Sequence, residues 1–165
     1  MRALVAGFGA LLIAATTSCA DQANLVDQGN LMIRCPDARG AIPVNDGQVT
    51  IDAVVMRVGA DLSVPAAPDE GMTFVIDLQF PDSPGAASPS VQCVRMRLEG
   101  ENLQWDAVPR RIDEHRDGSH ARVRSTGRDG PHWRLDDLVD VTIWLKTASG
   151  RHVLTLSRQP IHRPV

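Results

Sequence analysis

The 165-residue sequence contains no tyrosine, a single lysine (Lys146), three cysteines and few aromatic side chains, which make up 4% of the chain. It also lacks G-x-S-x-G, H-E-x-x-H and a serine three residues before its lysine, the signatures of several hydrolase classes. These absences argue against the enzymes that depend on such motifs. We expect no enzymatic activity, no catalytic residue and no bound cofactor.

A strong positive charge is also missing. The chain has 20 acidic and 17 basic residues and a net charge of −3, which becomes −4 when residues 1–18, including Arg2, are left out. Proteins that bind nucleic acid present a field of positive charge to the phosphates. We therefore expect no nucleic-acid partner.

The longest apolar run is too short to cross a bilayer. It covers residues 3–15, follows the positive charge of Arg2 and precedes the small, polar residues 16–18. These are the three regions of a signal peptide, whereas a membrane-spanning helix needs roughly 20 apolar residues. The sequence predicts a signal peptide at residues 1–18 and export of the remaining chain.

The end of this segment, Thr16-Thr17-Ser18-Cys19, resembles the lipobox of bacterial lipoproteins, although Thr16 stands where that pattern usually has leucine. The resemblance implies that Cys19 carries a lipid and that residues 19–29 tether the protein to a membrane of the bacterial cell envelope, facing the periplasm. A competing interpretation uses Ser18 and Ala20 as a small-x-small cleavage site. Cleavage after Ala20 would give a soluble periplasmic or secreted protein.

Two further cysteines, Cys35 and Cys93, remain after such processing. In an oxidising compartment, a pair without other partners is expected to form a disulfide. Closing a loop of about 58 residues is worth roughly 4 kcal/mol in the chain-entropy description. Two separate buried thiols are the alternative.

Hydrophobic periodicity predicts a chain made of strands. Residues 72–80 and 139–146 alternate strictly between apolar and polar side chains, which is typical of half-buried antiparallel strands. A strand is also expected at residues 48–58, where the apolar positions switch from odd to even numbers, which predicts a bulge or a strong twist near Val54. Further strands are expected at residues 30–34, 90–99, 103–108, 120–125 and 151–157.

Eight short strands separated by proline- and glycine-rich turns predict an all-β domain over residues 30–165, an antiparallel two-sheet sandwich. Residues 133–158 resemble the last corner of immunoglobulin-like and fibronectin-type domains. The resemblance implies an immunoglobulin-like architecture, although the tyrosine common at that corner is absent.

Few residues stand out as candidate sites. Trp144 falls on the polar face of its strand, and an exposed indole there would favour an interface with a partner protein, unless a loop or the amino-terminal segment covers it. His115 and His120 lie in a region read as a polar loop and are weak candidates for metal ligands, because their spacing matches no established motif. Neither is counted as a metal site.

These features favour a non-enzymatic binding or accessory module that contacts another protein of the envelope. The alternative function is a periplasmic copper- or zinc-handling protein that uses its loop histidines.

Replacing Cys19 by alanine is expected to release the mature protein from the membrane, because about 0.8 kcal/mol per buried CH₂ of the acyl chains supplies the attachment. Intact-mass analysis of the wild-type protein should find a chain that begins at a lipid-modified Cys19. An unmodified chain that begins at Asp21 would show that cleavage follows Ala20 instead.

Overall fold

The computed structural model describes residues 33–65, 67, 70–83 and 85–164. The predicted signal peptide, Cys19 and the tether at residues 19–29 lie outside these residues. The described part is all-β, as the sequence predicts. It contains no helix with the length and apolar character needed to span a membrane.

The described residues form a curled mixed sheet, a half-barrel, with the strand order β6-β5-β9-β10-β3-β4-β8-β7. Strand β1 adds to β10, and β2 adds to β3. The strands are β1 (Ile42–Pro43), β2 (Gln48–Ile51), β3 (Val54–Ser63), β4 (Met72–Pro81), β5 (Ser90–Leu98), β6 (Gln104–Ala107), β7 (Arg110–Arg116), β8 (His120–Gly130), β9 (Leu138–Lys146) and β10 (Arg151–His162).

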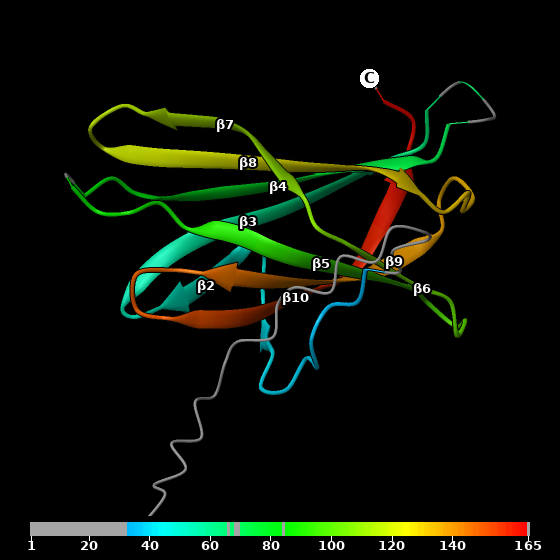
Figure 1. The fold of residues 1–165 in the computed structure, drawn as a ribbon, viewed down its shortest axis with the longest axis horizontal. Coiled ribbons are helices and arrows are strands. Elements are labelled where there is room, and N and C mark those ends of the chain that lie inside the picture. The colour runs from blue at the N-terminus through cyan, green and yellow to red at the C-terminus, as the bar shows by residue number, and fades with distance from the viewer. Residues whose placement is uncertain (1–32, 66, 68–69, 84, 165) are drawn as a thin grey trace, which may run out of the picture. The chain divides into compact units, whose positions relative to one another are not determined.

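Strand β10 joins the two halves of this sheet. It pairs antiparallel with β9 through Pro160, whereas Ile161 and His162 pair in parallel with the end of β3. Figure 1 shows the end of β10, in red, crossing from the layer of β9 toward the end of β3. Pro160 has no N–H to donate to a ladder, so the pairing with β3 begins only after it.

This arrangement differs from the antiparallel two-sheet sandwich that the sequence predicts. The β1–β10 and β10–β3 pairs are parallel, and the hydrogen-bonded path runs through β10 without a break. Periodicity along one strand carries no information about which distant strand lies beside it. The pairing of β10 with β3 is therefore a tertiary feature that the pattern could not reveal.

The strictly alternating segments form strands as predicted. In β4 the even-numbered residues from Met72 to Leu78 are fully buried, and Phe80 is half-buried. In β9 the odd-numbered residues from Val139 to Leu145 are buried in the same core. Met56, Met72 and Met96 also belong to this core.

The predicted bulge near Val54 is wrong, because the chain reverses at this point. Strands β2 and β3 form a hairpin in which Ile51 pairs with Val54. Asp52 and Ala53 form the turn between them, with positive φ values of 52° and 64°. Two consecutive positive φ values are typical of the tight type I′ turn. A two-residue turn changes the parity of the buried positions, which accounts for the switch in the apolar pattern.

The sequence did not reveal β7, which was read as a polar loop. All seven residues of β7 are exposed, and among the described strands β7 is an edge strand that pairs with β8 alone. Its charged side chains are suited to an edge, where they discourage pairing with another chain. The strand expected at residues 30–34 is not confirmed: residues 30–32 lie outside the described residues, and Ile33 and Arg34 are not in a strand.

The core is closely packed where Phe74 lies beside β8. Phe74 pairs with Gly127 across the β4–β8 ladder and meets Trp105 edge to face, with ring centroids 5.7 Å apart. A Cβ atom added at Gly127 would overlap the Phe74 ring, whereas one added at Gly59 would lie 4.0 Å from the nearest atom. The ring therefore occupies the space that a side chain at position 127 would need.

The Gly127→Ala substitution is expected to lower the free energy of unfolding by about 1–3 kcal/mol, because the Phe74 ring would have to move within a packed core. Gly59→Ala is the matched control and should change it by less than about 0.5 kcal/mol. Urea unfolding of both variants measures the difference. Equal stabilities would contradict the packing described here.

Candidate functional site

Trp144 lies on the outward face of β9, as the alternation predicts, but it is covered. Its cross-strand neighbours are Cys93 of β5 and Val153 of β10, and only 8% of its surface is exposed. It belongs to a small cluster with Cys35, Cys93 and Val153, apart from the main core. The expected exposed indole is therefore absent, and the segment that carries Cys35 provides the cover, which is the alternative raised from the sequence.

The predicted disulfide between Cys35 and Cys93 is present. Two charged side chains also hold the backbone of Cys35. Asp106 of β6 accepts a hydrogen bond from the Cys35 N–H at 2.7 Å, and Arg95 of β5 donates one to the Cys35 carbonyl oxygen at 2.9 Å. Cys35 is thus fastened through its sulfur and through both of its backbone polar groups.

Arg95 and Asp106 also bind each other. Two guanidinium nitrogens of Arg95 each lie 2.8 Å from a carboxylate oxygen of Asp106, whose side chain is only 4% exposed. The Arg95 guanidinium carbon stands 5.3 Å from the centroid of a Trp144 ring, a favourable cation–π distance. The four side chains form one unit, which we call the Cys35 clamp: Cys93, Arg95, Asp106 and Trp144.

One polar group of the clamp has no partner. The indole nitrogen of Trp144 is buried and makes no hydrogen bond with any described residue. A buried donor without an acceptor costs about 1–3 kcal/mol. Covering Trp144 with Cys35 therefore leaves one hydrogen-bond donor of this site unused.

A second feature lies where several hairpins end, at the left of Figure 1. Here an apolar cleft of about 220 Å³ opens between the β2–β3 turn, the β4–β5 loop and the β9–β10 turn. Its apolar lining consists of Ile51, Val54, Met56, Phe80, Pro81, Ala86, Ala87, Pro89 and Ala148. We call it the hairpin-end cleft.

Arg116 fixes one wall of this cleft. From the end of β7 it forms ion pairs with Asp82 and Glu114 and donates a hydrogen bond to the carbonyl oxygen of Ala86 at 3.1 Å. The pKa of Glu114 lies below its usual value. The main cause is the hydrogen bond from the Ser88 hydroxyl; burial opposes it, and a hydrogen bond from Arg116 adds to it. The β4–β5 loop is thereby tied to the edge strand.

The opposite wall contains a cluster of polar side chains from two hairpins. The Ser149 hydroxyl donates to the carboxylate of Asp52, and the Nε2 atom of His152 lies 3.2 Å from Ser149 Oγ and 3.7 Å from Asp52 Oδ2. The same Nε2 atom lies 3.1 Å from the Thr147 hydroxyl. In a catalytic Ser–His–acid triad the carboxylate binds the other ring nitrogen. All these groups meet at one nitrogen, so the cluster fastens two hairpins together and lacks the geometry of a triad.

The histidines named from the sequence lie apart from this cluster. His115 is exposed on β7, opposite Arg122, and His120 begins β8, where its ring nitrogen lies 3.0 Å from the Ser119 hydroxyl. Asp117 accepts hydrogen bonds from the backbone N–H of His120 and from the hydroxyl and backbone N–H of Ser119, which lower its pKa. Among the described residues no group of three or more histidine, cysteine or acidic side chains is placed to hold a metal ion.

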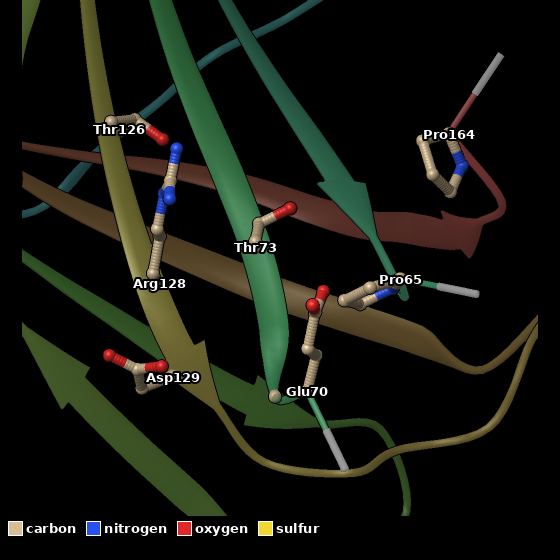
Figure 2. A pocket seen from close by; sticks show the side chains of 8 residues that line it. Pro65, Glu70, Thr73, Thr126, Arg128, Asp129 and Pro164 are labelled. Atoms are coloured by element: carbon tan, nitrogen blue, oxygen red, sulfur yellow. The ribbon is translucent and has the colours of Figure 1, made fainter. Parts of the chain in front are cut away.

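A polar hollow of about 510 Å³ lies at the ends of β3, β4 and β8. Figure 2 shows Thr126 and Arg128 on one strand, Thr73 on the next, and the carboxylates of Glu70 and Asp129 at the margin. The Thr126 hydroxyl donates a hydrogen bond to the carbonyl oxygen of Phe74 at 2.8 Å. Glu70, Arg128 and Asp129 form no ion pair with any residue that the structure describes, so the described part of the hollow presents separate polar groups.

Sequence reasoning identified Cys35, Cys93 and Trp144 but missed Arg95 and Asp106. The sequence held a signal for Arg95. It lies two residues after Cys93 in β5, so the two side chains share one face of the strand. Sequence reasoning also missed the joining of Asp52 to Ser149, which are 97 positions apart. No local pattern relates residues at such a separation.

The Asp106→Asn substitution is expected to lower stability by about 3 kcal/mol near neutral pH, because Arg95 would lose its partner in a largely buried pair. Burial alone would raise the pKa of Asp106, but hydrogen bonds from Arg95 and from the Cys35 N–H, with the charge of Arg95, outweigh it and lower the pKa. A lowered pKa contributes stability above the unfolded value of about 3.9, and this contribution is lost as the pH falls through the folded value.

The stability difference between the wild type and Asp106→Asn should therefore be full above about pH 5 and shrink at lower pH. Urea unfolding across this range measures it. Asp113→Asn, at an exposed carboxylate, is the control and should show little difference at any pH. A difference in the free energy of unfolding between the wild type and Asp106→Asn that stays constant down to pH 2 would contradict the proposed ionic contribution.

Comparison of the chain with protein-family models, curated proteins and solved structures gives no match. Its function is accordingly argued from its own residues.

Proposed function

We propose that this chain is an exported protein of the bacterial envelope, anchored through a lipid on Cys19, that binds another envelope protein without catalysing a reaction. The hairpin-end cleft is the observation that carries the proposal of binding. The signal-like residues 1–18 support export. The Cys35–Cys93 disulfide is in keeping with an oxidising compartment.

The size of the cleft favours a protein partner over a small molecule. Pockets for drug-sized ligands measure roughly 300–1,000 Å³, whereas a cavity of roughly 150 Å³ holds a single benzene ring. At about 220 Å³ the hairpin-end cleft matches one large apolar side chain. Protein interfaces commonly depend on a few such anchors that fill pockets on the partner.

The surroundings of the cleft support the same assignment. Val54, at the start of β3, lines the cleft and is 41% exposed, so part of the apolar lining is open to solvent. The wall formed by the β4–β5 loop is held by Arg116, and the opposite wall is held by the Asp52–Ser149 hydrogen bond. A pocket with walls held in place loses little conformational entropy when it binds an anchor.

An immunoglobulin-like relationship of the fold is a further proposal. The β9–β10 hairpin that closes the chain and the two layers of strands facing one core support it. The shared strand β10 would then be a local modification that links the layers.

The Ala87→Trp substitution fills the cleft and is expected to reduce partner binding at least about tenfold, because a truncated anchor contact at a hot spot costs 2 kcal/mol or more. Affinity purification of the lipidated protein from envelope membranes, with quantitative mass spectrometry, measures the proteins that co-purify. Val108→Trp is the control, because Val108 is 57% exposed and does not line the cleft.

The expected result is one protein that is retained by the wild type and by Val108→Trp but lost from Ala87→Trp. A set of co-purifying proteins that is the same for all three variants would overturn the assignment of the cleft. Recovery of the wild type from the soluble fraction, with no lipid, would overturn the proposed anchoring.

A further inference from the structure

The Cys35 clamp holds Cys35 in the way that a binding site holds one residue of an extended peptide. Asp106 binds the backbone N–H, Arg95 binds the backbone carbonyl oxygen, and the side chain lies against Trp144 and Cys93. The flanking residues Ile33, Arg34, Pro36 and Asp37 are all exposed. Among residues 33–37, Cys35 alone is buried, and its backbone is held through the N–H and carbonyl groups of an ordinary peptide unit.

We propose that the Cys35 clamp is a docking site for an extended, cysteine-bearing segment of a partner protein, and that Cys35 occupies it as an internal ligand. This inference rests on the proposed function as an envelope interaction module. The partner's backbone takes the place of Cys35 between Asp106 and Arg95, and its cysteine becomes covalently linked to Cys93.

The covalent step is a thiol–disulfide exchange. A thiolate of the partner attacks Sγ of Cys93, the bond between Cys35 and Cys93 breaks, and Cys35 leaves as a thiolate. One disulfide is consumed and one is formed, so no external oxidant or reductant is needed. The proton released by the partner's thiol balances the proton that the Cys35 thiolate takes up.

The geometry favours attack at Cys93 over attack at Cys35. Cys93 lies within β5 and is paired with Trp144 of β9, so it is held by the sheet. Cys35 lies in a segment without strand pairing and can move away as the leaving group. Both sulfurs are in buried residues, so the exchange follows local release of the Cys35 segment.

Trp144 gives the partner a means to displace Cys35. Its indole N–H is buried and finds no acceptor among the described residues while Cys35 is in place. A partner segment that places a carbonyl or hydroxyl oxygen at this nitrogen gains a hydrogen bond that the internal ligand does not make. Such a segment makes one hydrogen bond in the clamp that Cys35 does not make.

The test uses the mature chain with Cys19→Ala and Cys35→Ala, which leaves Cys93 as its single thiol. The probe is the acetylated, amidated peptide of residues 33–38 (IRCPDA), mixed with reduced and oxidised glutathione. Intact-mass analysis measures how much Cys93 is linked to the peptide and how much to glutathione. We expect at least a tenfold preference for the peptide.

The same chain unfolded in urea gives the reference preference for the peptide over glutathione. Adding Asp106→Asn to the folded chain should lower the preference close to this reference value, whereas adding Asp113→Asn should leave it unchanged. Circular dichroism in the same buffers verifies that each variant is folded. In a second measurement the chain keeps Cys35, and peptide mapping locates the mixed disulfide, which we expect at Cys93. A preference that is absent, or unchanged by Asp106→Asn, overturns the docking site, as does linkage mainly at Cys35.

The failure of this inference is distinguishable from failure of the proposed function. The peptide measurement needs no natural partner and does not involve the hairpin-end cleft, so Ala87→Trp should leave the peptide preference unchanged. Loss of the preference in Ala87→Trp would contradict a docking site at the Cys35 clamp.

Discussion

The pairing of β10 with both β9 and β3 is the constraint on which the curled sheet depends. Along most of its length β10 forms an antiparallel ladder with β9, and at its end Ile161 and His162 form a parallel pair with β3. The ladder with β9 contains a bulge between Leu156 and Gln159 and ends at Pro160, and the pairing with β3 begins at Ile161. Because one strand serves both halves, the apolar faces of the sheet are held around a single core.

Enclosing one core leaves the other face of each strand outside, and this determines where the unusual residues lie. Trp144 alternates with the core residues of β9 and must therefore stand on the outer face. The Cys35 segment covers it there, held by the disulfide and by the Arg95–Asp106 pair. The cover is thus a consequence of placing a large aromatic side chain on an otherwise polar sheet face.

The two proposed binding surfaces use different physical means. The hairpin-end cleft offers apolar area and a fixed shape, with its walls joined by Arg116 and by the Asp52–Ser149 hydrogen bond. The Cys35 clamp offers charged groups that recognise a peptide backbone, together with a sulfur that can be exchanged. An anchor in the cleft provides affinity by excluding water, whereas the clamp provides a covalent link that depends on the thiols present.

Several strands could be predicted because alternate burial leaves its mark on successive residues. The apolar positions of β4 and β9 read directly as one buried face, and the local register of the polar face placed Trp144 correctly. The β2–β3 turn was wrongly predicted to be a bulge. Both a bulge and a two-residue turn shift the buried positions from odd to even residue numbers, so the apolar pattern alone does not tell them apart. Strand β7 gave no signal at all, because an exposed edge strand buries no alternate residue.

By itself the sequence determined the all-β class, several of the strands and the partnership of Cys35 with Cys93, because periodicity and the number of cysteines are properties of the chain alone. Only the tertiary structure decided the mixed curled sheet, the cover over Trp144 and the cleft between the hairpins. Each of these joins residues far apart in the chain, such as Cys35 with Asp106 and Asp52 with Ser149. The free energy of such contacts depends on how strands pack around a common core, which no local pattern encodes.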